Sequence, residues 1–254
     1  MQVPIGLATQ TVGSTIRPGS FNGIYAMKQT WNSISREGQK LYSLIFDTLG
    51  LYSRSVEDLK LFLDAFQLVD DEPVESFTVK GAKFALLALP TPEWPEPGPG
   101  TVAALKKGAE LLRAHGAEIE EITLPDEFRS IYKYHLQVLS GDGRVAFLPD
   151  YCQSKDKMHQ SLLGHAENND KHTRQDQLKA FDGLAAMRPK LDALASKYAA
   201  IYWPERFKGE NGMPIGLSVI AGRYRDQYLL RVCSEVENIF EAEGGWARYI
   251  TLAE

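Results

Sequence analysis

Residues 8–18 read ATQTVGSTIRP, and this stretch decides how the rest of the chain is interpreted. It places a serine, Ser14, behind a short turn of threonine and glycine and ahead of Ile16-Arg17-Pro18. Such a turn can direct several backbone N–H groups toward one point beside a hydroxyl group. Attack on a carbonyl requires a nucleophile, and hydrogen-bond donors already in place for the developing oxyanion. The stretch therefore predicts a nucleophile loop for acyl transfer, although a lone serine at this point is more typical of an ordinary turn.

The composition is that of a globular protein without nucleic-acid or membrane partners. Its 254 residues suffice for one large domain or two small ones. Charged residues make up 24%, and the formal net charge of -5 argues against a nucleic-acid-binding protein. The sequence shows no apolar run of bilayer length and no signal-peptide pattern, and its cysteines, Cys152 and Cys233, lack metal-ligand spacing. We therefore expect a cytoplasmic protein that needs no metal or cofactor.

The residues around the loop predict a strand, more loop and a helix. A short apolar run at residues 3–7 predicts a buried strand that leads into the turn. Residues 18–23 are rich in Gly, Ser and Asn and predict a loop, residues 24–27 are apolar, and residues 30–50 are again typical of a loop. A helix is expected from Ser55, because Ser-Val-Glu-Asp resembles a capping box. The apolar face of this helix comprises Leu59, Phe62, Leu63 and Phe66.

The middle of the chain has the pattern of a β-α-β unit. The apolar run Lys83–Leu89 predicts a buried strand, and residues 90–100 predict a loop. Thr101 is expected to cap a helix that ends at Gly116. Residues 118–124 alternate apolar and acidic side chains, as a half-buried strand does. A strand, a helix and a strand with short links imply parallel pairing.

The remaining segments predict a helical region, a strand and a closing helix. Residues 126–200 are mostly helical in pattern, with an exposed polar turn or loop at residues 168–177. Residues 214–220 predict a buried strand, and residues 228–243 predict the final helix. The fold class that these patterns indicate is α/β.

A series of motifs, in order, resembles the amidase signature family. Residues 9–23 read TQTVGSTIRPGSFNG and are similar to the family's Gly-Thr-(Asp/Gln)-Thr-Gly-Gly-Ser core with the Ile-Arg-Pro that follows it. Any one of the matches alone is a weak signal, but the matches together identify the chain as a member of this family. The further matches are MKQT at 27–30, SREG at 35–38, DTLG at 47–50, RSVED at 54–58 and GMPIGLSVI at 212–220.

The resemblance implies a fold and a domain organisation. The family fold is a mixed β-sheet sandwiched between helical layers, and we expect an incomplete version of it. Residues 1–254 then form one partial amidase domain. Its parts are the nucleophile loop and following helix at 3–66, the β-α-β unit at 82–124, the mostly helical region at 126–200 and the closing strand and helix at 212–243.

The resemblance also implies a chemistry. Family members cleave or transfer the acyl group of carboxamides through a serine acyl-enzyme, without a metal or cofactor. Ser14 is then the catalytic nucleophile, and the substrate is a small-molecule amide. The implied oxyanion-hole donors are the backbone N–H groups of Thr11, Val12, Gly13 and Ser14, and the implied supports of the loop are Gln10 and Arg17.

Three departures from the family pattern lower the expected activity. The family's catalytic lysine and bridging serine precede the nucleophile loop, and Lys28 does not replace that lysine because it matches a downstream structural one. Val12 stands where the family has glycine, and if the turn needs a positive φ there, a β-branched residue is strained by about 1–3 kcal/mol. Residues 198–204 resemble a strand of the family that a long segment normally separates from the closing strand. Here only residues 205–211 lie between the two. We therefore expect a truncated member, with a second copy or a partner chain covering the missing part of its sheet.

Other functions stay open on the sequence. One alternative is a catalytically inactive amidase remnant, with a binding or scaffold role or none. Another is an amidotransferase A-type subunit, which belongs to the same family. The acidic run at residues 118–121 is typical of a solvated strand face and not of a metal site. A Ser-His-Asp triad has little support, because nothing in the sequence couples the histidines to Ser14. These are His115, His135, His159, His165 and His172.

Overall fold

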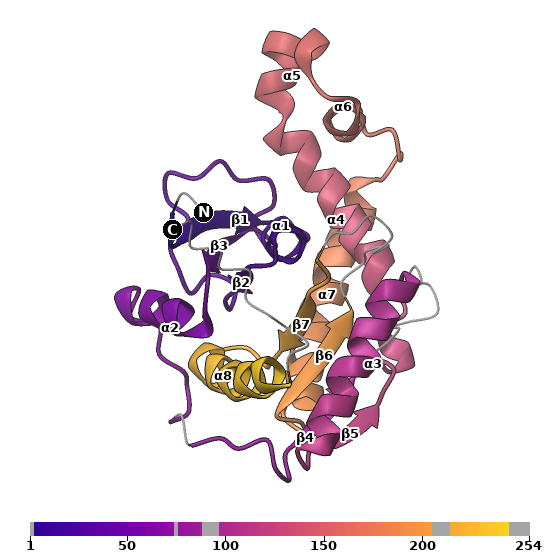
Figure 1. The fold of residues 1–254 in the computed structure, drawn as a ribbon. Coiled ribbons are helices and arrows are strands. Elements are labelled where there is room, and N and C mark those ends of the chain that lie inside the picture. The colour runs from indigo at the N-terminus through magenta and orange to yellow at the C-terminus, as the bar shows by residue number, and fades with distance from the viewer. Residues whose placement is uncertain (1–2, 74–75, 88–96, 205–213, 244–254) are drawn as a thin grey trace.

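The computed structural model describes residues 3–73, 76–87, 97–204 and 214–243, and its strands form two sheets (Figure 1). The first is antiparallel, in the order β1-β3-β2, and the second is mixed, in the order β5-β4-β6-β7. The predicted α/β class is confirmed, although the described strands belong to two sheets instead of one. The strands are β1 Gly6–Gln10, β2 Tyr25–Lys28, β3 Thr48–Ser53, β4 Lys83–Leu86, β5 Glu118–Glu121, β6 Ala200–Pro204 and β7 Leu217–Ile220.

Helices cover both sheets, and one group of helices extends away from them. In Figure 1, α5 and α6 lie at the far end of α4, remote from both sheets. In the part of the chain that the structure describes, no helix combines the length and apolar character needed to cross a membrane. The helices are α1 Ile16–Asn22, α2 Val56–Ala65, α3 Pro99–Ala114, α4 Ile131–Ala146, α5 Leu148–Ser154, α6 Gln160–Glu167, α7 Arg174–Ala195 and α8 Asp226–Ala242, with 3₁₀ turns at Asp126–Phe128 and Lys155–Lys157.

The first sheet packs one face against α2. Leu51 lies at the centre of the sheet, opposite Leu7 on β1 and Met27 on β2, and it is completely buried. The helix begins as predicted after Ser55, whose hydroxyl accepts the N–H of Asp58 at 3.1 Å. Three of the four predicted apolar residues are buried in this core, whereas Phe66 follows the end of the helix and is exposed. The amphipathic pattern therefore predicted the packing of α2 correctly.

Two elements near the nucleophile loop correct the sequence predictions. The predicted loop at 18–23 is largely part of helix α1, and the predicted loop at 30–50 ends in the central strand β3. Pro18 is compatible with α1 because it lies in the first turn, where its missing N–H is no loss. Gly23 closes the helix with φ 61°, a left-handed conformation that suits glycine. The strand predicted at 3–7 begins later, at Gly6, and runs to Gln10, and the predicted burial is wrong because Val3, Ile5 and Leu7 are exposed.

The predicted β-α-β unit is confirmed. Strand β4 pairs with β5 in parallel, and α3 connects them. Successive residues of β4 alternate between two cores: Phe84 and Leu86 pack on the α3 side, and Ala85 packs on the α7 side. This burial on both faces explains the continuous apolar run of the sequence. Helix α3 starts at Pro99 after Gly98, so the prediction that Thr101 caps it is wrong; Thr101 is buried inside the first turn.

The helical region and the closing elements agree with the predictions except at their ends and in the burial of β7, which is half-buried where a buried strand was predicted. The polar stretch predicted at 168–177 ends earlier, because Thr173 and Asp176 form a capping box that starts α7. The closing helix α8 starts at Asp226 and contributes to the cores of both sheets, with Leu230 in the first and Val232 in the second. Residues 90–96 of the predicted loop and the connection at 205–211 lie outside the described residues.

The contact between Thr15 and Gly50 gives a test of the fold. Thr15 is fully buried, and a Cβ atom at Gly50 would overlap its side chain. We expect Gly50→Ala to lower the free energy of unfolding by about 1–3 kcal/mol, measured by chemical denaturation. Gly6→Ala is the matched control on the neighbouring strand, because its added Cβ would only reach Tyr52 at 3.7 Å. Equal stability of the two variants would contradict this packing.

Candidate active site

The predicted nucleophile Ser14 lies in the turn that connects β1 to α1. Its side chain is exposed, and its carbonyl oxygen accepts the hydroxyl of Tyr52 at 3.3 Å. Within the described residues the Ser14 hydroxyl makes no hydrogen bond, and the backbone N–H groups of residues 11–14 have no acceptor. The turn therefore presents a hydroxyl and a run of unused backbone donors on one short segment.

The side chain of Gln10 holds the end of this turn in place. Its side chain is buried, and its carboxamide oxygen accepts the N–H groups of Thr15 at 3.1 Å and Ile16 at 3.0 Å. These are among the first N–H groups of α1, which have no partner within the helix. Gln10 therefore acts as a cap from outside the helix and joins its N-terminus to the end of β1.

Asp47 holds the other side of the turn. It is buried, and one carboxylate oxygen accepts the Thr11 hydroxyl at 2.6 Å while the other accepts the Tyr42 N–H at 2.6 Å. Arg36 donates to the Asp47 carbonyl oxygen at 2.9 Å. The DTLG motif therefore anchors the nucleophile loop through its aspartate, a role that the motif alone did not predict.

Val12 is accommodated without the strain that its β-branched side chain would suffer at positive φ. Among the described residues other than glycine, positive φ angles occur at positions away from this turn, so the predicted strain at Val12 is not found. Its side chain is 57% exposed and points away from the packed core. The non-glycine residues with positive φ are Asn32, Gln67, Asn168, Lys171 and Tyr224.

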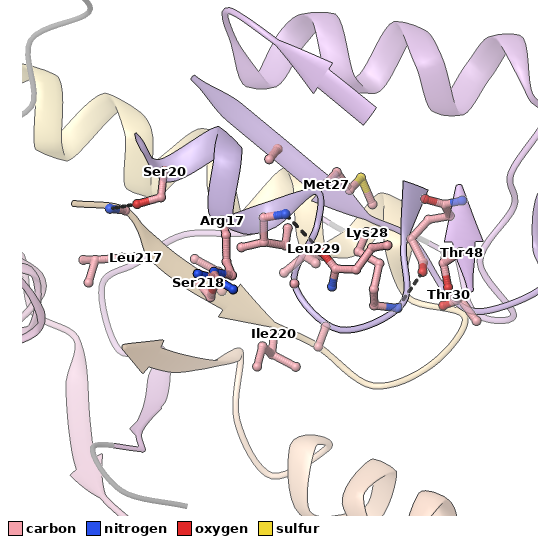
Figure 2. Close-up of a pocket in the computed structure, with 18 of the residues that line it drawn as sticks. Arg17, Ser20, Met27, Lys28, Thr30, Thr48, Leu217, Ser218, Ile220 and Leu229 are labelled. Atoms are coloured by element: carbon pink, nitrogen blue, oxygen red, sulfur yellow. Dashed lines mark hydrogen bonds between the residues drawn. The ribbon is translucent and has the colours of Figure 1, made fainter. Parts of the chain in front are cut away.

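A large cleft of about 1850 Å³ opens beside the turn. Its walls come from the turn and α1, from β7, and from one face each of α7 and α8. Figure 2 shows Arg17 extending from α1 toward β7, and Ser20 accepting the N–H of Gly216 at 2.7 Å. The predicted support residue Arg17 thus lines the cleft, and α1 is tied to the segment that leads into β7.

Lys28 lies on the wall of the same cleft (Figure 2). Its ammonium group donates to the Gln29 carbonyl oxygen at 3.0 Å. The side chain reaches solvent inside the cleft, but the surrounding protein desolvates it and lowers its pKa, an effect that the negative charge of Asp226 partly offsets. Within the described residues it forms no hydrogen bond with Ser14.

The structure does not assemble a Ser-His-Asp triad among the described residues. His135 lines the cleft and packs on Phe46 with ring centroids 4.8 Å apart. His159 caps α6, and His165 packs against Tyr42, both on the helical extension. Of the acidic run at 118–121, Glu120 pairs with Lys83 at 2.6 Å, and no group of metal-ligating side chains is found in the described part of the chain.

The fold and this site define an α/β protein with a serine-bearing turn at the rim of a large cleft. The model of the family Amidase matches residues 1–181, so the chain belongs to the amidase family. The resemblance identified in the sequence is thereby confirmed. The A-type subunit of the glutamyl-tRNA(Gln) amidotransferase of Enterococcus faecalis is 33% identical over 148 residues, which are 53% of this chain and 30% of that protein.

Solved structures show the same fold. A crystal structure of an amidase superposes with a TM-score of 0.76 at 18% identity, over 92% of this chain and 62% of the other. The 6-aminohexanoate cyclic dimer hydrolase complexed with substrate superposes with a TM-score of 0.75 at 16% identity, over 93% of this chain and 64% of the other. The chain therefore spans about a third of the length of the curated relative, and under two thirds of these structures.

The capping role of Gln10 can be tested directly. Gln10→Leu keeps the size of the side chain but leaves the N–H groups of Thr15 and Ile16 without an acceptor. We expect it to lower the free energy of unfolding by about 1–3 kcal/mol. Gln10→Glu is the control, because it retains an acceptor oxygen and adds a negative charge at the N-terminus of α1. If the leucine variant is as stable as the glutamate variant in denaturant titrations, Gln10 does not cap α1.

The desolvation of Lys28 predicts a pH dependence. A lysine reacts with acylating reagents only as the neutral amine, so a pKa below the usual 10.5 shifts the rise in reactivity to lower pH. We expect acetylation of Lys28 by acetic anhydride, measured on its peptide by mass spectrometry, to reach half its maximal rate at a lower pH than for Nα-acetyl-lysine amide in the same tube. Coinciding profiles for the peptide and the free amide would refute this.

Proposed function

We propose that the protein cleaves the C–N bond of a carboxamide through an acyl-enzyme on Ser14. The observation that carries the proposal is the turn itself, in which an exposed serine directly follows backbone N–H groups that have no acceptor in the described structure. Membership of the amidase family supports the reaction class. The large cleft beside the turn supports a small-molecule amide as the substrate.

The proposed reaction has two steps. Ser14 Oγ bonds to the carbonyl carbon, and the carbonyl oxygen takes up negative charge that the N–H groups of Thr11, Val12, Gly13 and Ser14 stabilise. The C–N bond then breaks, and the amine leaves with a proton. Water next attacks the acyl-enzyme, which releases a carboxylic acid and restores the serine. Each oxyanion donor typically contributes about 3–4 kcal/mol to the transition state.

Removal of the Ser14 proton needs a base. In the family this is the task of a lysine and a bridging serine that precede the nucleophile loop. Gln10 and Asp47 have a different part in the proposal, since they hold the turn in place without contacting the substrate. A cytoplasmic location belongs to the same proposal.

A fluorophosphonate probe tests the nucleophile. We expect the probe to label Ser14, detected by mass spectrometry, and we expect Ser14→Ala to abolish labelling. The same variant should lower hydrolysis of small carboxamides such as butyramide, followed by ammonia release, at least about 1000-fold. Ser196→Ala is the matched control, because Ser196 is an exposed serine outside the cleft. Absent labelling of the wild-type protein would instead favour the catalytically inactive remnant.

A second candidate is the amide-transferring component of an amidotransferase. The similarity to the A-type subunit of the glutamyl-tRNA(Gln) amidotransferase favours it, and such a role would require partner subunits. The two candidates differ in where activity resides. Ammonia release by the purified chain alone supports the hydrolase, whereas activity confined to a complex that copurifies from the native cell supports the transferase role.

A further inference from the structure

One face of α7 forms a wall of the cleft, and it carries two charged groups among apolar ones. The residues that line the cleft recur at helical spacing along this helix, so they share a face. They are Leu184, Met187, Arg188, Leu191 and Asp192. Charges on an apolar wall are only partly solvated, and each therefore needs a partner more than a surface charge does.

Asp192 has its partner within the protein. The guanidinium of Arg223 donates to one carboxylate oxygen of Asp192 at 2.6 and 2.7 Å, and the Arg223 N–H donates to the other oxygen at 3.0 Å. Both oxygens of Asp192 are therefore occupied. Arg188 lies one helical turn before Asp192, where an aspartate would ordinarily pair with it, but Arg223 has taken that position.

Arg188 is left without a carboxylate among the described residues, and no hydrogen bond of its guanidinium is found there. Its contact is with an aromatic ring: the guanidinium lies 5.8 Å from the ring centroid of Trp31. Burial and the nearby charge of Arg223 lower the pKa of Arg188, although an arginine keeps its charge at neutral pH. The α7 face of the cleft thus holds a positive charge that has no carboxylate partner among the described residues.

A chain of contacts connects this charge to the predicted nucleophile turn. Trp31 also lies 5.5 Å from the guanidinium of Arg36, which donates to the Asp47 carbonyl oxygen at 2.9 Å. Asp47 in turn accepts the hydroxyl of Thr11, a residue of the turn. Arg188 is therefore connected to the turn through Trp31, Arg36 and Asp47.

We propose that Arg188 binds a carboxylate of the substrate, so that the protein acts on amides that also carry an acid group. A guanidinium offers two parallel N–H donors to a carboxylate, which suits a single planar anion. That the substrate is an amide rests on the function proposed above, whereas binding of its carboxylate does not depend on Ser14.

Binding in the absence of catalysis tests the subsite. The probe is glutarate, titrated by calorimetry or NMR into the Ser14→Ala protein, in which no turnover occurs. We expect Arg188→Gln in that background to weaken glutarate binding about 10- to 100-fold, and Arg188→Lys, which keeps the charge but not the fork of donors, to weaken it less. Lys179→Gln is the matched control, because it removes a positive charge from an exposed position of α7 outside the cleft.

The outcomes separate the subsite from the catalytic proposal. Undetectable glutarate binding, equal binding in the presence and absence of Arg188, or tighter binding of inorganic phosphate than of glutarate would overturn the subsite. Loss of fluorophosphonate labelling with intact Arg188-dependent glutarate binding would overturn the nucleophile alone. In an active protein, Arg188→Gln should raise KM for glutaramate about 10- to 100-fold and should change KM for butyramide, which has no carboxylate, by less.

Discussion

The acceptor oxygen of Gln10 sets the geometry on which the site depends. Gln10 is the last residue of β1, and its side-chain oxygen accepts hydrogen bonds from the first two N–H groups at the start of α1. The chain therefore passes from strand to helix within residues 11–15. The reversal has room only because Thr15 packs over Gly50 of the neighbouring strand. A helix of this length has little stability of its own, and therefore α1 exists because these tertiary contacts hold it.

Contacts near Thr30 and Asp226 help to join the two sheets on either side of the cleft. Asp226 accepts the Thr30 N–H at 2.8 Å, and the Thr30 hydroxyl accepts the Tyr224 N–H at 2.9 Å. Burial raises the pKa of Asp226, and the hydrogen bond from Thr30 opposes that rise. Since α8 begins at Asp226 and packs into both cores, these bonds fix the two walls relative to each other. The distance across the cleft is therefore set by contacts between residues almost two hundred positions apart.

The sequence predicted the elements whose pattern is local and missed those that tertiary contacts create. Helix α2 and the β-α-β unit carry their own periodicity and caps, and both were predicted correctly. Helix α1 was missed because Gly19 and Ser20 look like loop residues, while its cap comes from Gln10 outside the helix. Strand β3 was missed because its sequence, TLGLYS, contains polar residues and a glycine, which are not typical of a central strand. For the same reason the link between Arg188 and Trp31 has no signal in the sequence, since it joins distant segments.

The anchoring of the turn explains why its backbone N–H groups lack acceptors in the described structure. A tight turn into a helix normally consumes its N–H groups in its own hydrogen bonds or in capping. Here side chains at the flanks meet those needs: Gln10 takes up the N–H groups of Thr15 and Ile16, and Asp47 takes up the hydroxyl of Thr11. The Arg17 N–H closes the turn on the carbonyl of Gly13 at 2.9 Å. Because side chains and residues after the turn supply these bonds, the N–H groups from Thr11 to Ser14 have no acceptor in the described structure, which is what the proposed oxyanion hole requires.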